Sequence, residues 1–149
     1  MSIQQIITIS LLVVPWLTIL FMDEHERRRF MPTTLFTAVT SGLIYEFGMM
    51  LNFWHFEEVS FPLVMYGLLP IIGMWVIRFT YGHFLRFMVV NAILDLGFAF
   101  VLAPMFDSIG ILGSNPYTGL YIYTINIFHA ASLYGYQVWQ EGHGAAKAR

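Results

Sequence analysis

Five apolar windows, separated by short polar or turn-rich stretches, follow one another along the chain. Each is close to the roughly 20 apolar residues that a helix needs to cross a bilayer core about 30 Å thick. Segments in a bilayer make their backbone hydrogen bonds internally, and no window shows the alternating polarity of a membrane strand, so helices are predicted. The predicted spans cover residues 3–22, 31–54, 61–79, 85–106 and 117–139.

The lysines and arginines lie on one side of this arrangement. Three consecutive arginines at positions 27–29 separate the first two windows, Arg78 and Arg86 flank the turn between the third and fourth, and Lys147 and Arg149 follow the fifth. The opposite side has no lysine or arginine, only the acidic residues Glu57, Glu58 and Asp107. By the positive-inside rule, this separation predicts an all-α bundle of five transmembrane helices with the N-terminus outside and the C-terminus inside.

The composition of the 149 residues agrees with a membrane protein. Charged residues make up 11% of the chain, against about 25% in a typical soluble domain, and the mean hydropathy is +0.67. With a net charge of −2 and no cysteine, no nucleic-acid partner, disulfide framework or thiolate metal site is expected. We expect a single transmembrane domain over residues 1–149 in contact with the lipid bilayer, its first window retained because no cleavage site follows it.

Aromatic residues mark both predicted boundaries of the bilayer. Interfacial belts of tryptophan and tyrosine are typical of membrane proteins. The outer boundary has Trp54, Tyr117 and Tyr121, and the inner one has Tyr81, Tyr136 and Trp139.

Five polar side chains inside the predicted spans are the candidate site: Glu46, Asn91, Asp95, Asn126 and His129. An ionisable residue there costs about 2.5–3.5 kcal/mol on insertion scales, so each needs an explanation. Asn91 and Asp95 are four residues apart, and Asn126 and His129 are three apart, so each pair shares a helix face. If these faces meet, the side chains form a polar column ending at Glu46, and an imidazole near a carboxylate suits a proton relay or a cation site.

Other hydroxyls accompany these residues, and more than one interpretation stays open. Thr37, Ser41 and Tyr45 lie near the level of Glu46. The structural interpretation is that Asp95 and His129 pair and lock two helices together, with the asparagines as interhelical hydrogen-bonders worth roughly 0.6 kcal/mol each. A proton relay or transport site is the second interpretation, and a cofactor or lipid site is the third.

No enzymatic chemistry is predicted. The chain has no nucleophile–base pair at a recognisable spacing, no H-E-x-x-H and no G-x-S-x-G motif. We expect no metal site and no cofactor, since only one histidine, His129, lies deep in a span. The predicted function is a small integral membrane protein that handles a proton, a cation or a small polar solute. The alternatives are an accessory subunit that binds partner membrane proteins, or a lipid-binding protein with a groove near Arg78 or Arg86; the short chain favours a homo-oligomer or a partner membrane protein.

A set of aromatic and polar positions is also similar to those of a known group of proteins. The positions are 29–36 (RFMPTTLF), Tyr45, the Tyr81-Gly82 turn, Asn91, Asp95 and the closing Tyr136-x-x-Trp139. Over about residues 25–140 the chain resembles an uncharacterised family of small bacterial integral membrane proteins with about five helices. The resemblance implies a stand-alone five-helix unit in the bacterial cytoplasmic membrane, and it implies no catalytic residues.

Overall fold

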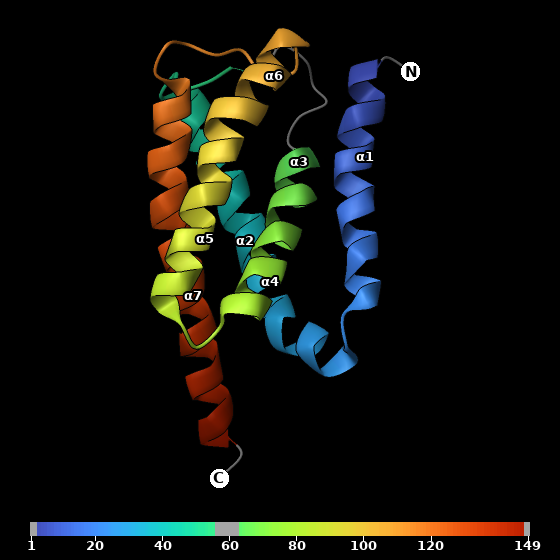
Figure 1. Ribbon diagram of the computed structural model, residues 1–149, viewed down its shortest axis with the longest axis vertical. Helices are drawn as coiled ribbons and strands as arrows, with labels where there is room; N and C mark the ends of the chain where they lie inside the picture. Colours follow the sequence, from blue (N-terminus) through green and yellow to red (C-terminus); the bar gives the residue numbers. More distant parts are fainter. Residues whose placement is uncertain (1–2, 56–62, 148–149) are drawn as a thin grey trace.

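The computed structural model describes residues 3–55 and 63–147, which form an all-α bundle of five helical rods (Figure 1). In chain order the elements are α1 (Ile3–Thr18) with its 3-10 extension η1 (Ile19–Phe21), α2 (Glu24–Met50), α3 (Leu63–Tyr66), α4 (Leu68–Thr80), α5 (Phe84–Gly97), the π-helical turn η2 (Phe98–Leu102), α6 (Ala103–Ser108) and α7 (Thr118–Lys147). The predicted all-α fold with five helical rods is confirmed. The residues Glu57, Glu58 and Arg149, and the start of the predicted third span, lie outside the described residues.

Three rods are longer than predicted: the second (Glu24–Met50), which nevertheless ends before the predicted residue 54, the fourth (Phe84–Ser108) and the fifth (Thr118–Lys147). The second begins at Glu24 instead of residue 31, because the charged segment taken as a loop is the first part of α2. Glu24 and Glu26 lie in its first turn, where carboxylates interact favourably with the helix dipole. Glu24 also forms an ion pair with Arg28 at 2.5 Å. At the other end of the chain, α7 continues past residue 139 to Lys147.

The third rod is broken between α3 and α4. Pro70 has no N–H to donate to the carbonyl of Tyr66, so the helical ladder is interrupted there. The indole Nε1 of Trp16 on α1 donates to that carbonyl at 2.9 Å. A Cβ at Gly67 would lie 2.3 Å from the carbonyl oxygen of Leu11, so only glycine permits α1 to approach this closely. At this break, α1 is therefore held in close contact with the rest of the bundle.

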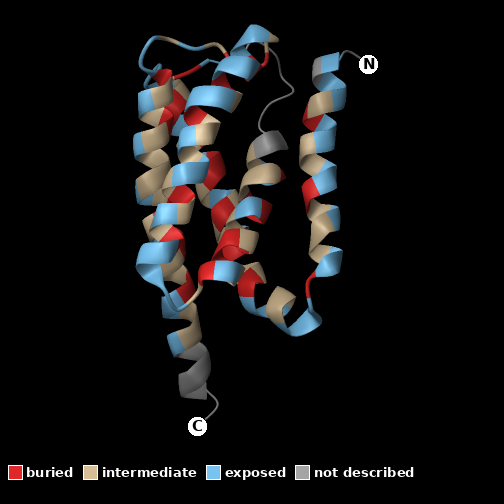
Figure 2. Ribbon diagram, in the orientation of Figure 1, coloured by how far each residue is buried: buried red, intermediate tan, exposed pale blue. Residues whose placement is uncertain are grey.

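Buried positions on the rods lie mainly on the sides that face the other rods (Figure 2). On α2, the polarity of the exposed and buried faces is reversed relative to a helix in a soluble protein. Its outward face is apolar, with Leu35 53%, Val39 61%, Leu43 54% and Phe47 59% exposed. Its inward face is rich in hydroxyls, and the buried residues include Thr33, Thr34, Thr37 and Ser41. A surface helix in water carries its apolar stripe inward. The core of this bundle is therefore unusually polar where α2 contributes to it.

Among the described helices there is one candidate membrane span. The continuous rod Phe84–Ser108 is long and apolar enough to cross a membrane, and 17% of its apolar window is buried inside the bundle. Two more segments, Gln5–Phe21 and Leu68–Thr80, are apolar but shorter. The placement of all five rods across a membrane stays a prediction.

The two ends of the bundle differ in charge. The described arginines lie at one end, called here the arginine end: Arg27, Arg28, Arg29, Arg78 and Arg86. The opposite end, called the Trp54 end, contains Trp54 and the long connection between α6 and α7.

Candidate functional site

Four of the five predicted polar residues, all except Glu46, lie between two apolar clusters of the core. At the Trp54 end, one cluster contains Tyr45 of α2, Ala99 of the fourth rod and Ile122 of α7. Nearer the arginine end, the other contains Phe30, Phe87 and Ala130 from the same three rods. On each rod the polar side chains fall between these positions along the sequence. The fold therefore gathers them in one polar layer across the middle of the bundle.

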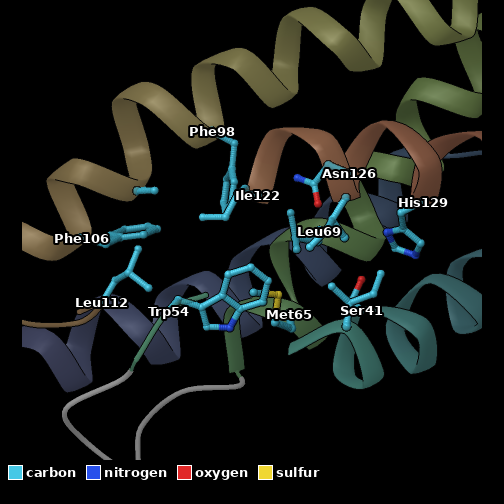
Figure 3. A pocket seen from close by; sticks show the side chains of 13 residues that line it. Ser41, Trp54, Met65, Leu69, Phe98, Phe106, Leu112, Ile122, Asn126 and His129 are labelled. Atoms are coloured by element: carbon cyan, nitrogen blue, oxygen red, sulfur yellow. The ribbon is translucent and has the colours of Figure 1, made fainter. Parts of the chain in front are cut away.

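Two adjoining cavities occupy this layer. The Trp54 cavity has a volume of about 40 Å³ and extends from His129 and Ser41 towards Phe106 and Leu112 (Figure 3). The Asp95 cavity has a volume of about 60 Å³ and lies on the side of Asn91 and Asp95. The two share four lining residues: Ser41, Leu69, Asn126 and His129. A water molecule needs about 10–15 Å³ by this measure, so each cavity has room for a few waters.

Unpaired polar atoms are concentrated at these cavities. In the described part of the chain, the buried side-chain atoms without a hydrogen-bond partner are Ser41 Oγ, Trp54 Nε1 and Asp95 Oδ2. Ser41 lines both cavities, Trp54 lines the first and Asp95 lines the second. A buried polar group without a partner costs about 1–3 kcal/mol. All three atoms therefore belong to residues that line the cavities.

Four of the five candidate residues meet at the Asp95 cavity: Asn91, Asp95, Asn126 and His129. The amide of Asn126 donates to Asp95 Oδ1 at 3.2 Å. The amide of Asn91 donates instead to the carbonyl of Phe87 on its own helix at 2.8 Å.

Asp95 and His129 are not bonded to each other. Among the described residues no ion pair joins them, because Asp95 bonds Asn126 and the Nε2 atom of His129 lies 2.6 Å from Thr40 Oγ1. The hydroxyl of Thr40 also lies 2.8 Å from the carbonyl of Phe36, which can only accept. We therefore assign the single hydroxyl proton to that carbonyl and the Nε2–H tautomer to His129, which donates to Thr40. The structure therefore has two separate hydrogen bonds, Asp95–Asn126 and His129–Thr40, in place of the direct Asp95–His129 pair that was one interpretation of the sequence.

Glu46 lies away from the cavities. It is exposed on α2, and neither cavity includes it in its lining. The buried residues Thr37, Ser41 and Tyr45 follow one another at intervals of four and define the inward face of the helix. Glu46 comes one residue after Tyr45, which turns it by about 100° around the helix. The polar column expected to end at Glu46 therefore ends instead at Ser41 and Trp54.

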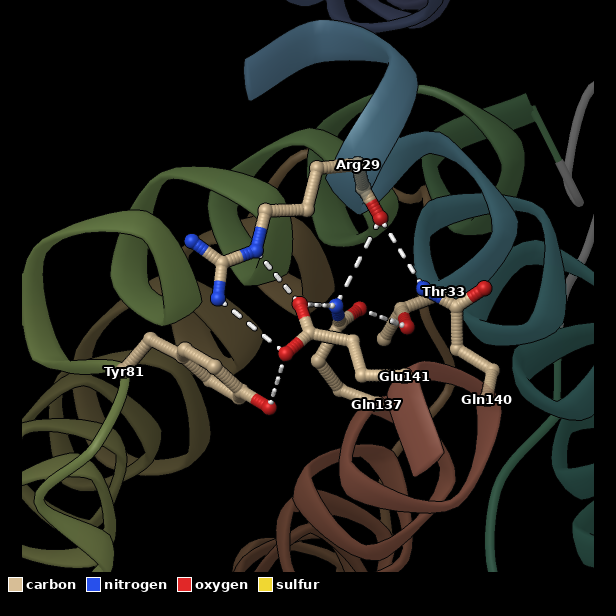
Figure 4. A network of polar contacts seen from close by, with 6 residues as sticks. All are labelled: Arg29, Thr33, Tyr81, Gln137, Gln140 and Glu141. Atoms are coloured by element: carbon tan, nitrogen blue, oxygen red, sulfur yellow. Dashed lines mark hydrogen bonds and ion pairs between the residues drawn. The ribbon is translucent and has the colours of Figure 1, made fainter. Parts of the chain in front are cut away.

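A second polar cluster closes the arginine end of the bundle (Figure 4). The guanidinium of Arg29 on α2 bonds both carboxylate oxygens of Glu141 on α7. The hydroxyl of Tyr81, in the turn between α4 and α5, donates to Glu141 Oε2 at 2.7 Å. Fully buried Gln137 accepts from Thr33 Oγ1 at 2.5 Å and donates to Glu141 at 2.9 Å. The cluster ties α2 and α7 to the turn between α4 and α5.

The charges in this cluster shift one another's pKa values. Hydrogen bonds from Arg29, followed by those from Tyr81 and Gln137, lower the pKa of Glu141 to about 2 against its burial. Burial and the bond to Glu141 raise the pKa of Tyr81 to about 12. The same carboxylate raises the pKa of Arg29. Glu141 is therefore ionised throughout the physiological pH range. The group of Arg29, Tyr81, Gln137 and Glu141 is called here the clamp.

Several of these residues were not singled out from the sequence. Trp54 was predicted only as an interfacial aromatic, whereas it is 5% exposed and lines a cavity. Ser41 was named as a neighbour of Glu46, and the four-residue spacing of hydroxyls on α2 was the signal that it faces inward. Gln137 and Glu141 fall at or beyond the edge of the last predicted span, and no local motif marks them.

The chain was compared with known proteins. No family model matches it, and no curated protein or solved structure matches it. Within residues 3–55 and 63–147, no group of three His, Cys, Asp or Glu side chains could hold a metal ion.

Proposed function

We propose that the chain is a multi-pass membrane protein whose five rods all cross the bilayer. The reversed faces of α2 carry this proposal, because Leu35, Val39, Leu43 and Phe47 are exposed while the hydroxyls lie inside. Such an outward apolar face is costly in water and favourable in lipid. The hydroxyls also explain why α2 is less apolar than a simple span. Three of them, on Thr34, Thr37 and Thr40, bond carbonyls of the same helix.

The proposed orientation places the arginine end inside and the Trp54 end outside, in the cytoplasmic membrane of a bacterium. The distribution of the arginines supports it through the positive-inside rule. Because the chain has no cysteine, single cysteines can report the topology. In whole cells an impermeant maleimide is expected to label Ser114→Cys directly, and His25→Cys only after lysis. The opposite labelling pattern would overturn the orientation, and labelling of both sites in intact cells would overturn the five-span topology.

We further propose that the polar layer handles a proton, a cation or a small polar solute. The meeting of Asn91, Asp95, Asn126 and His129 at the Asp95 cavity carries this proposal. Asp95 supplies a carboxyl with one free oxygen, and His129 supplies a titratable ring in the wall that both cavities share. Titratable groups along a hydrated intramembrane path are the usual components of proton relays. Asn91 and Asn126 add neutral amides that can bond a passing water or solute.

Flux through purified protein in liposomes tests this function. The variant Asp95→Asn keeps the shape of the side chain and removes its proton exchange, so we expect proton flux to fall on the order of 10²-fold, the lower end of what a positioned proton-transfer group contributes. Glu46→Gln makes the same chemical change outside the cavities and is expected to leave flux unchanged. If wild-type liposomes conduct protons, sodium and potassium no faster than empty ones, the proton and cation forms of the proposal fail.

An accessory role is the alternative that a specific observation favours. The clamp of Arg29, Glu141, Gln137 and Tyr81 closes the arginine end, so a continuous path requires the clamp to open or a partner to complete it. A second copy of the chain or a partner membrane protein, packed on the apolar surface, would complete this path. An accessory subunit would show no flux of its own and would copurify with that partner from mild detergent. A lipid-binding protein would instead retain specific lipid on purification.

A further inference from the structure

We propose that the Asp95 cavity binds a small cation that carries N–H donors, namely ammonium or a short primary alkylammonium ion such as methylammonium. This inference rests on the proposed function and names the cation that the polar layer handles. It requires binding but not flux, so the inference and the proposed function can fail separately.

The charge of the cavity wall favours a cation. Asp95 is the one acidic or basic side chain among the described residues of the lining. No ion pair of the described residues includes it, and its Oδ1 atom accepts from the uncharged amide of Asn126. A buried charge is normally paired, because the loss of its hydration is costly. An ionised Asp95 therefore attracts one positive charge into the cavity, and in a poorly hydrated interior this attraction acts without direct contact.

Both amides in the wall are turned so that an oxygen is left over. Asn91 Nδ2 donates to the carbonyl of Phe87. Asn126 Nδ2 donates to Asp95 Oδ1. A carbonyl and a carboxylate only accept, so the nitrogen of each amide must be the atom that faces them. The two amide oxygens have no partner in the described part of the chain. In Figure 3 the oxygen of Asn126 points towards Leu69, which is part of the wall of both cavities.

His129 adds a third acceptor. Its Nε2–H donates to Thr40, so its Nδ1 atom carries the lone pair of the neutral ring. Among the described residues Nδ1 has no partner. Unlike Asp95 Oδ2, neither Nδ1 nor the two amide oxygens belong to the unpaired atoms that are closed off from water. The wall of the Asp95 cavity therefore holds three free acceptors with surface that a small molecule can reach.

These acceptors favour an N–H cation over an alkali ion. Sodium and potassium are hard cations that prefer oxygen ligands, and an imidazole nitrogen suits them poorly. Ammonium and methylammonium carry several N–H donors, so either ion can bond the imidazole lone pair and the amide oxygens together. The cavity volume of about 60 Å³ has room for a few waters, and each of these ions is about the size of one or two.

Gly73 on α4 offers a way to fill the cavity without disturbing the bundle. It lines the cavity, and a Cβ there would lie 3.9 Å from Leu133 Cδ1 and from Thr37 Oγ1, which belong to two other lining residues. These are ordinary contact distances, so Gly73→Ala adds a methyl group to the wall without a clash. The methyl group reduces the room for the ligand, so the larger methylammonium should lose more affinity than ammonium.

Equilibrium binding of radiolabelled methylammonium to the protein in nanodiscs of uncharged lipid tests the proposal, with empty nanodiscs as the background. We expect saturable binding that ammonium displaces. Potassium is similar in size to ammonium but has no N–H donor, so it should displace the label at least about tenfold less well, as loss of a hydrogen bond to a charged group implies. No saturable binding, or equal displacement by potassium and ammonium, would overturn the proposal from the wild-type protein alone.

Variants with normal melting curves locate the site. Asp95→Asn should weaken methylammonium binding about tenfold or more, and Glu46→Gln, which removes a carboxylate outside the cavities, should not. Gly73→Ala should weaken the binding of methylammonium more than that of ammonium. Gly135→Ala on α7, outside the lining, should change neither. Unchanged binding in Asp95→Asn, or equal effects of the two alanine variants, would overturn the assignment to this cavity.

Binding and flux together separate this inference from the proposed function. Proton flux without methylammonium binding would leave the proposed function standing and overturn the ammonium site. Methylammonium binding without flux of protons, sodium or potassium would leave the site standing and overturn the proposed transport of those ions.

Discussion

Thr33 on α2 and Gln137 on α7 share a 2.5 Å hydrogen bond between two buried side chains, at the point where the two helices meet near the arginine end. The bond orients the Gln137 amide so that its nitrogen faces Glu141 and the carbonyl of Arg29. The uncharged Thr33–Gln137 pair thus positions the Gln137 amide, which is one of the hydrogen-bond partners of the Glu141 carboxylate.

Removing the Thr33 hydroxyl is expected to destabilise the protein. The variant Thr33→Val leaves the amide oxygen of Gln137 buried without a partner, which costs about 1–3 kcal/mol. Ser41→Ala is the matched control, because the Ser41 hydroxyl has no partner in the described residues, so its removal breaks no bond to the protein and is not expected to lower stability. Reversible unfolding in mixed micelles measures both values. Equal losses for the two variants would contradict the assignment of these hydroxyls.

Glu141 is expected to make stability depend on pH under acidic conditions. Its pKa is lowered from 4.5 to about 2 in the folded protein, chiefly by the bond from Arg29. A lowered pKa means that the carboxylate stabilises the fold fully above its ordinary pKa near 4.5, and that this contribution is lost as the pH falls towards 2. The melting temperature of the wild type should therefore exceed that of Glu141→Gln by a constant amount above pH 5, and the difference should shrink below pH 4.5. A difference that persists unchanged at pH 2.5 would contradict the assignment.

Asp95 and His129 are expected to act independently in stability. Each is bonded to its own partner, Asn126 for Asp95 and Thr40 for His129. The effects of Asp95→Asn and His129→Ala should therefore add to within about 0.5 kcal/mol in the double variant. Asp95→Ala and Asn126→Ala remove two ends of one bond and should deviate from additivity by more than that. A large coupling between Asp95 and His129 would show that they pair in the bilayer and would favour a purely structural role.

Alanine substitutions at two glycines on different rods are expected to have opposite effects on stability. At Gly67 a Cβ would lie 2.3 Å from a backbone oxygen of α1, so Gly67→Ala must displace α1 and should cost about 1–3 kcal/mol. At Gly135 on α7 no atom beyond the neighbouring backbone of its own helix lies within 4 Å of the added Cβ, so Gly135→Ala should raise stability by up to about 1 kcal/mol. Thermal melting of the two variants compares them directly. A melting temperature unchanged by Gly67→Ala would show that α1 is held less closely than described.

Much of the helical layout could be predicted from the sequence, because long apolar windows determine where helices form whether or not their ends are known. The ends were less predictable. The charged segment before residue 31 is helical because its acidic residues occupy the first turn of α2. The break before Pro70 has a local cause in the sequence, whereas the close approach of α1 at Gly67 depends on residues far away in the sequence.

The candidate site was predictable where helical spacing alone decides it. Asn91 with Asp95, and Asn126 with His129, were expected to share faces, and the structure brings all four to one cavity. Trp54 was not predictable as a lining residue, because its position depends on Gly48 and on the loop that holds Phe53. Glu46 was included in the candidate site for its charge. The four-residue spacing of the hydroxyls on α2 already indicated that Glu46 lies on a different face of the helix.

The outward face of α2 offers the most direct test of the account. A nitroxide attached at Leu43→Cys, which is 54% exposed in the bundle, would face lipid if the rods cross a membrane. In reconstituted protein we predict frequent collisions of this label with oxygen and few with a water-soluble nickel complex, with the reverse pattern for a label at Ser114→Cys. Frequent collisions of the Leu43 label with the nickel complex would place this face in water and contradict the membrane-spanning bundle with a polar interior.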